Sequence, residues 1–159
     1  MSTTTPKVTE INDKLNKVGV TDGSVAQPGE VGEYIETVGS TVNSIGNNSN
    51  TNLQTLVLQP GSWDVTGFCI YDPTGDDSST VTIMHVGISL TSTVITNSSD
   101  VKPSHFTSAV GYRMNAPAHR IDISTPTTVY LVTRLTDYTG TVPSNRRMLT
   151  PTIYARRVR

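Results

Sequence analysis

The chain has 159 residues, of which 35% are apolar and one is cysteine, and its formal net charge is −1. This length predicts one domain with room for a short appendage. The single cysteine excludes an intrachain disulfide framework, the near-neutral charge argues against nucleic-acid binding, and the low apolar fraction predicts either a thin sandwich or a protomer that completes its core against its own copies.

Residues 1–19 are expected to form a polar arm followed by a short amphipathic helix that ends at Gly19. Four apolar residues recur at helical spacing and predict one apolar stripe: Val8, Ile11, Leu15 and Val18. A helix of three turns is marginal alone in water, so another surface must cover the stripe. That surface is either the protein's own β-domain or a larger body to which the helix anchors the subunits. Residues 20–30 resemble a spacer, which favours the anchor.

Residues 31–159 are expected to form one all-β domain, an antiparallel sandwich or jelly roll of eight or nine short strands. Asn97–Ser104 is expected to be a loop and Gly87 a bend or a bulge. The last strand ends the chain and is expected to lie within a sheet. The expected strands are Val31–Val38, Leu53–Gln59, Ser62–Tyr71, one or two within Thr80–Ile95, Phe106–Met114, His119–Ser124, Thr127–Tyr138 and Leu149–Arg159.

The charges are unevenly distributed along the chain. Residues 18–101 contain nine acids and no Lys or Arg, and residues 102–159 contain nine bases and two acids, so the two parts carry charges of −9 and +7. We expect these parts to pair with each other, across strands or between subunits. The candidate contacts between subunits join two acids to the C-terminal arginines: Glu33, Glu36, Arg156, Arg157 and Arg159. Capture of a carboxylate or phosphate ligand by these arginines is the alternative.

The aromatic residues suggest a core or interface role more than a binding platform. Four of them are expected to fill the core or a subunit interface: Tyr34, Trp63, Tyr130 and Tyr154. Sugar stacking, with Tyr71, Tyr112 and Tyr138 added, is the alternative.

No catalytic residue, metal site or cofactor is predicted. The three histidines, His85, His105 and His119, lack zinc-binding spacing, and Cys69 lies in an apolar run typical of a buried side chain. The acidic run Asp72–Asp77 lacks the ligand spacing of an EF-hand and predicts a solvated turn. The sequence also lacks a nucleophile elbow, a phosphate loop and a dinucleotide fingerprint, and no apolar run predicts membrane insertion.

Five segments of the chain belong together in this order: GEYIE (Gly32–Glu36), LQPGSWDVTGFCIY (Leu58–Tyr71), VGISLTS (Val86–Ser92), RIDISTPTTVYLVTR (Arg120–Arg134) and IYARRVR (Ile153–Arg159). They resemble segments of small β-domains in tail-fibre, receptor-binding and decoration proteins of tailed bacteriophages. The resemblance implies an all-β sandwich, usually homotrimeric, whose N-terminal segment docks on the virion. Cys69 and the segments Asp72–Ser79 and Val142–Arg147 depart from it, so specificity carried by loops is not implied.

The resulting hypothesis is a non-enzymatic phage virion protein, made in the host cytoplasm and displayed on the virion surface. It would be a homotrimeric decoration or short fibre held to capsid or tail proteins through residues 1–19. The alternative is a receptor-binding tail-fibre tip, in which Gly39–Asn52 or Asn97–Ser104 contacts a host surface glycan or protein. A polysaccharide hydrolase is disfavoured because spacing identifies no carboxylate pair.

Overall fold

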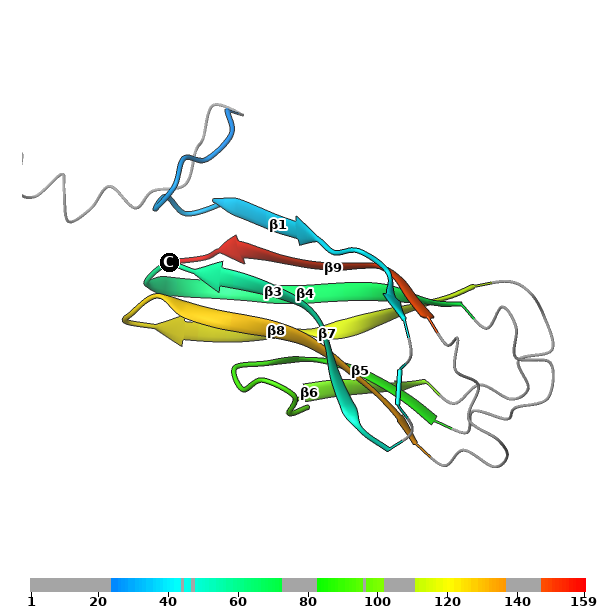
Figure 1. The fold of residues 1–159 in the computed structure, drawn as a ribbon. Helices are drawn as coiled ribbons and strands as arrows, with labels where there is room; N and C mark the ends of the chain where they lie inside the picture. The colour runs from blue at the N-terminus through cyan, green and yellow to red at the C-terminus, as the bar shows by residue number, and fades with distance from the viewer. Residues whose placement is uncertain are drawn as a thin grey trace, which may run out of the picture.

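The computed structural model describes residues 24–43, 45–46, 48–72, 83–95, 97–101, 111–136 and 147–159. Within these residues the protein consists of β-strands and contains no helix (Figure 1). The helix predicted within residues 1–19 lies outside them. The strands are β1 (Tyr34–Val38), β2 (Val42–Asn43), β3 (Asn50–Leu58), β4 (Gly61–Asp72), β5 (Ile83–Ser89), β6 (Asn97–Val101), β7 (Tyr112–Ile123), β8 (Thr127–Thr136) and β9 (Arg147–Arg157).

The strands form two antiparallel sheets that face each other (Figure 1). In sheet A the order is β1-β9-β4-β7, and β2 also pairs with β9. In sheet B the order is β3-β8-β5-β6. Every pairing is antiparallel. The predicted all-β fold with antiparallel sheets is therefore confirmed.

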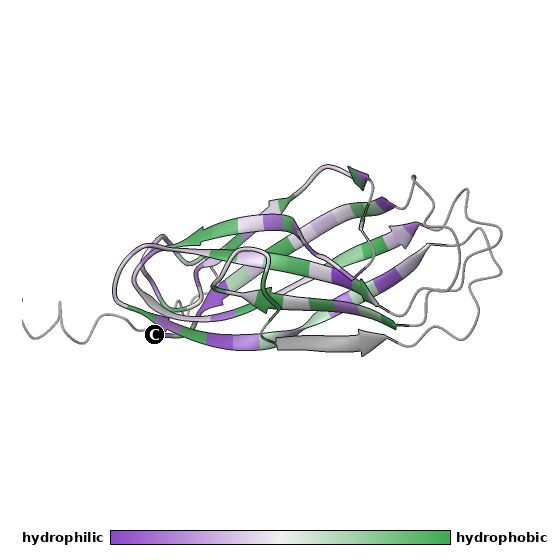
Figure 2. Ribbon diagram, turned by 60° about the horizontal axis from the view of Figure 1, so that its bottom comes forward, coloured by the Kyte–Doolittle hydropathy of each residue, from purple (hydrophilic) through white to green (hydrophobic). Residues whose placement is uncertain are grey.

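The core lies between the sheets and follows from the alternation of side chains along each strand, which Figure 2 shows as alternating hydropathy. On β4 the residues predicted to share one face are all buried: Trp63, Val65, Gly67, Cys69 and Tyr71. Sheet B contributes apolar side chains from three strands to the same cluster: Leu56, Leu58, Met84, Val86, Ile88, Val129, Leu131 and Leu135. One shared core therefore joins the two sheets.

Gly67 is required where β4 passes close to its neighbours. A Cβ atom at this position would lie 2.6 Å from the carbonyl oxygen of Thr152 and 3.1 Å from Cδ1 of Leu131. Glycine therefore allows β4 to contact both β9 and the facing sheet at the centre of the sandwich.

Cys69 is a buried apolar side chain, as predicted, and burial raises the pKa of its thiol from 9.0 to about 12. Between these values the unfolded thiol loses its proton while the folded thiol keeps it, so the free energy of unfolding should fall as the pH rises. We expect a loss of about 1.4 kcal/mol per pH unit above pH 9 that is absent in Cys69→Ala. Urea unfolding of both proteins at pH 8 and pH 10 measures this difference, and an equal pH dependence in the two would contradict it.

Two predicted strands, Phe106–Met114 and His119–Ser124, are wrong as separate elements, because β7 runs through from Tyr112 to Ile123. Pro117 lies within this strand, where the sequence suggests a break. The pairing with β4 shifts register between Ala116 and His119, which places Pro117 in a bulge of an edge strand. Edge strands and bulges are where proline is tolerated in a sheet, because its missing N–H removes no ladder hydrogen bond there.

Two further expectations in sheet B are wrong. Asn97–Val101, predicted as a loop, forms β6 and pairs with β5 over its whole length. Gly87, predicted as a bend or bulge, pairs in continuous register with both Ser98 and Val132. Pairing within the sheet therefore outweighs the low strand propensity of Asn, Ser and Gly at these positions.

The C-terminal strand is held in a sheet, as predicted. β9 lies between β1 and β4 in sheet A and pairs with both. Among the described residues, no helix is long and apolar enough to cross a membrane.

Candidate functional site: the entry end of the sandwich

The start of β1 and the end of β9 lie together at one end of the sandwich, which we call the entry end (Figure 1). The N–H of Gly32 donates to the carbonyl of Arg157 at 2.8 Å, and the N–H of Arg157 donates to the carbonyl of Glu33 at 2.8 Å. The N–H of Ser62 donates to the carbonyl of Arg159 at 2.9 Å. The first two bonds fix the segment before β1 to the end of β9, and the third fixes Arg159 to β4.

The opposite end of the sandwich, the far end, is where three longer connections begin and finish. The strand ends that flank residues 73–82, 102–110 and 137–146 lie beside one another in the sheets. Their register partners show this: Asp72 with Arg147, Tyr71 with Tyr112, Ile83 with Thr136 and Met84 with Val101. The entry end and the far end are therefore separated by the length of the strands.

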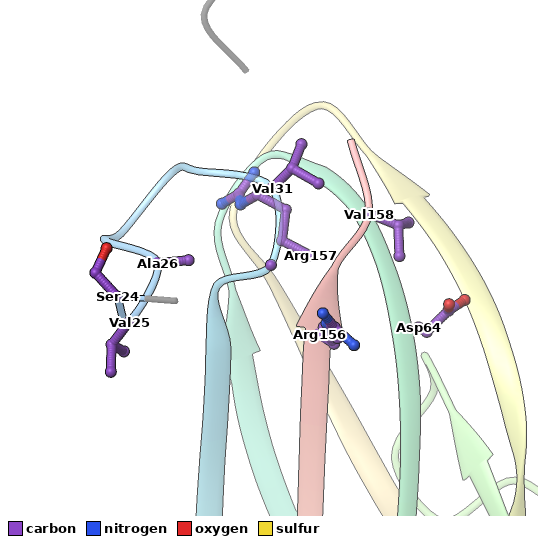
Figure 3. A pocket seen from close by; sticks show the side chains of 9 residues that line it. Ser24, Val25, Ala26, Val31, Asp64, Arg156, Arg157 and Val158 are labelled. Atoms are coloured by element: carbon purple, nitrogen blue, oxygen red, sulfur yellow. The ribbon is translucent and has the colours of Figure 1, made fainter. Parts of the chain in front are cut away.

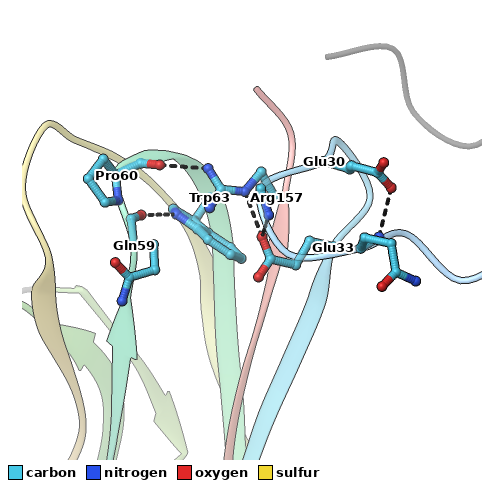
Figure 4. Close-up of polar contacts among 8 residues, drawn as sticks. Glu30, Glu33, Gln59, Pro60, Trp63 and Arg157 are labelled. Atoms are coloured by element: carbon cyan, nitrogen blue, oxygen red, sulfur yellow. Dashed lines mark hydrogen bonds and ion pairs between the residues drawn. The ribbon is translucent and has the colours of Figure 1, made fainter. Parts of the chain in front are cut away.

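A buried ion pair closes the entry end (Figure 4). Nε of Arg157 donates to Oε2 of Glu33 at 2.8 Å, and the two side chains are only 3% and 9% exposed. The same carboxylate oxygen accepts the N–H of Gly29 at 2.7 Å, and Nη1 of Arg157 donates to the carbonyl of Pro60 at 2.6 Å. We call Glu33, Arg157, Pro60 and Trp63 the latch. It ties the segment that precedes β1 to β9 and to the turn between β3 and β4.

Trp63 packs beneath the side chain of Arg157 in the latch. The guanidinium carbon of Arg157 lies 4.3 Å from the centroid of the indole ring, a cation–π contact. The indole N–H donates to the carbonyl of Gln59 at 2.8 Å, so the buried ring also has its polar group satisfied. The predicted core position of Trp63 is confirmed.

Gly61 is required by the latch. Its φ of +147° lies in a region that side-chain-bearing residues rarely adopt, and a Cβ atom there would collide with Nη1 of Arg157. The turn signal Pro60–Gly61 therefore also makes room for the arginine side chain.

A groove of about 470 Å³ runs beside the latch at the entry end (Figure 3). Its sides are mixed in character, with apolar residues from the segment before β1 and from the end of β9 facing charged residues of sheet A. Val25 is the most exposed of the large apolar side chains that the structure describes. The lining residues are Ser24, Val25, Ala26, Val31, Gly32, Asp64, Arg156, Arg157 and Val158.

The expected contacts between subunits for Glu33 and Arg157 are corrected by the structure, because these residues pair within one chain and are buried. Two further ion pairs are cross-strand neighbours: Arg120 with Asp64 at 2.5 Å and Arg147 with Asp72 at 2.5 Å. Each of the three pairs joins an acid of residues 18–101 to an arginine of residues 102–159. The expected pairing of the two parts thus occurs across strands.

The remaining charged candidates lie on the surface, where contacts between subunits stay a prediction. Glu36, Arg156 and Arg159 are exposed. Glu36 accepts the hydroxyl of Tyr34 at 3.0 Å, and Asp64, the register neighbour of Arg156, is held by Arg120 in two hydrogen bonds. The hydrogen bonds from Arg120 lower the pKa of Asp64.

The other aromatic candidates do not lie in the core. Tyr34 is exposed and Tyr154 half-buried, and their rings are 5.9 Å apart on the outer side of sheet A. Tyr130 is half-buried on β8. Of the four aromatics, only Trp63 fills the core.

The acidic and histidine side chains of the described residues are spread over both sheets. In that part of the chain, no group of three or more His, Cys, Asp and Glu side chains could hold a metal ion. Asp72, the first residue of the acidic run, pairs with Arg147, and Asp76 and Asp77 lie outside the described residues. His85 and His119 lie on different sheets, and His105 is outside the described residues.

The missed feature is the latch. The charge distribution predicts that Arg157 has an acidic partner, and Pro60–Gly61 predicts a turn, but nothing in the sequence links them. Comparison with protein-family models finds none that matches this chain. Comparison with curated proteins likewise finds no sequence relative.

Proposed function

We propose that the protein is a non-enzymatic structural component of a bacteriophage virion, a homotrimeric decoration or short fibre anchored through its N-terminal segment. Its place is the virion surface, and its partners are capsid or tail proteins and its own copies. The proposal rests on the resemblance stated above and on one structural observation, the separation of the entry end from the far end.

This separation suits a projecting appendage. The segment that leads to residues 1–23 leaves from the entry end, where the latch ties it to β9 and the β3–β4 turn. The connections of residues 73–82, 102–110 and 137–146 begin at the far end. A body held at one end therefore presents the other end outwards.

The strand order supports a jelly roll as the form of the body. The chain passes from sheet A to sheet B between β2 and β3, then changes sheet at each connection except β5–β6, and its last strand returns beside its first. The two sheets, β1-β9-β4-β7 and β3-β8-β5-β6, follow the order of an eight-strand jelly roll with β2 added. Viral capsid and carbohydrate-binding domains use this architecture, an analogy of fold and not of function.

Deletion of residues 1–19 tests the anchor. We expect the sandwich to fold and the truncated protein to be lost from particles, because the predicted apolar stripe is removed. Immunoblots of purified virions measure incorporation, and circular dichroism measures folding. Within the full chain, Leu15→Asn should reduce incorporation at least tenfold, and the matched control Asp13→Asn, on the opposite predicted face, should not. Normal incorporation of the truncated protein would contradict the proposal.

A second candidate function is attachment to a host surface glycan or protein. The position of the strand ends that flank three connections favours it, because all three connections begin at the far end. One of the two segments expected to touch the host, Gly39–Asn52, fits less well: Asn50 and Asn52 lie on β3, where their side-chain amides donate to the carbonyl of Thr93 and to Oγ of Ser92, each at 2.8 Å. Binding of the purified protein to whole host cells distinguishes this function from decoration alone.

A further inference from the structure

The two edges of sheet A differ in a way that suits contact between copies of the chain. Among the described strands, β1 pairs only with β9 and β7 pairs only with β4, so these are the two edge strands of sheet A. Edge strands are places where strands from another chain can add. The edge of β7 is interrupted by the bulge at Pro117, whereas β1 pairs with β9 in unbroken register.

The β1 edge exposes two large side chains and has one protective feature, the charge of Glu36. Tyr34 and Val38 are 53% and 61% exposed on its outer side. The strand YIETV contains no lysine, proline or bulge, the features that usually protect an edge. Glu36 lies at its centre and is its only charged residue. β1 is therefore suited to pairing with a strand of another chain. The negative charge of Glu36 determines which strand fits beside it.

A two-fold contact between two β1 strands is disfavoured by that charge. Antiparallel pairing about the centre of the strand would place Glu36 opposite Glu36 of the second copy, and like charges directly opposite each other are destabilising. The strand next to β1 should instead carry a positive charge.

The β7 edge carries that charge. Arg113 is exposed there, its guanidinium carbon lies 3.7 Å from the centroid of the Phe68 ring, and its Nε donates to Asn115 at 3.2 Å. Neither contact neutralises its charge. Arg120, on the same strand, is already held by Asp64. Arg113 is thus the arginine of β7 that remains available to a carboxylate of another chain.

We propose that β1 of one copy pairs with the start of β7 of the next copy, with Glu36 opposite Arg113. The path β1-β9-β4-β7 has an even number of strands, so copies related by rotation about an axis along the strands bring β1 and β7 together antiparallel. Glu36 and Arg113 both lie on the outer face of sheet A, which directly opposed residues must share. In this register Tyr34 lies opposite Asn115, so the pairing ends before Pro117.

This contact is heterologous, because each copy uses a different edge on each side. Such contacts form a closed ring when the rotation from each copy to the next leads back to the first copy. The inference rests on the proposed homotrimer and identifies the two edges that build it.

Charge reversal tests the contact in the full-length protein. Glu36→Arg and Arg113→Glu each place like charges opposite one another, and each should raise the dissociation constant of the assembly at least tenfold. The double variant restores an attractive pair and should recover most of the wild-type affinity. Sedimentation equilibrium measures the assembly, and thermal unfolding checks that each variant is folded.

A matched pair of substitutions controls for general surface effects. Val38→Lys on β1 should weaken assembly, and Val57→Lys on β3, at a position that is 56% exposed, should not. The inference is overturned if either charge reversal leaves assembly unchanged, if the double variant fails to recover, or if the wild-type chain is monomeric. The virion incorporation assay still tests anchoring in each of these cases, so the two failures can be told apart.

Discussion

Replacing Arg157 with methionine is expected to lower the free energy of unfolding by about 3–5 kcal/mol, the range typical for breaking a buried ion pair. The substitution leaves the carboxylate of Glu33 buried with only the N–H of Gly29 as a described partner. It also removes the hydrogen bond to the carbonyl of Pro60. Urea unfolding followed by the fluorescence of Trp63, the one tryptophan of the chain, measures the loss.

Arg120→Met is the matched control. It breaks an arginine–carboxylate pair with Asp64 that is likewise joined through Nε, but on the exposed side of sheet A. Exposed pairs contribute little, so this variant should unfold like the wild type. Combining Arg157→Met with Glu33→Leu should recover part of the lost stability, because neither charge then remains buried. If Arg157→Met and Arg120→Met were equally stable, the latch would have no structural role.

Replacing Trp63 with alanine is the second change of large effect, with an expected loss of about 3–5 kcal/mol. The indole is fully buried between the sheets, so its removal leaves a cavity under Arg157. The substitution also leaves the carbonyl of Gln59 without its indole donor. Because the fluorophore is lost, circular dichroism or calorimetry has to follow unfolding.

Trp63→Phe separates packing from hydrogen bonding at this position. A phenyl ring keeps an aromatic face under Arg157 but lacks the N–H that binds Gln59. Its expected loss is about 1–2 kcal/mol, within the usual range for a single substitution. If phenylalanine and alanine cost the same, the aromatic face would contribute nothing to the entry end.

Alternation along the chain was sufficient to predict the β-structure where one face of a strand is buried. The face of β4 that contains Trp63, Val65 and Cys69 follows directly from the period of two. The strand Asn97–Val101 lacks this alternation. It forms because it pairs with β5, and its own sequence does not favour a strand. The sequence predicts two strands, one on each side of Pro117, where the structure has the single strand Tyr112–Ile123. Proline is tolerated in a strand at the edge of a sheet, and the sequence does not show that this strand is an edge.

The latch could be predicted only in part. The uneven charge distribution indicated that acids before residue 102 would meet arginines after it, and the three ion pairs agree. Glu33 and Arg157 are 124 residues apart in sequence, however, and only the position of β9 beside β1 brings them together. Sequence spacing carries no information on such a pair.

The position of β9 also decides when the protein can fold. The strand at the middle of sheet A is the last of the nine to be synthesised, and its partner β1 is the first. While residues 147–157 remain inside the ribosome, β1 has no neighbour and β4 is paired on one side at most. Folding must therefore follow translation of β9. Contacts between residues this distant in sequence also form slowly, so the nascent chain carries the apolar strands of sheet A uncovered until β9 has emerged.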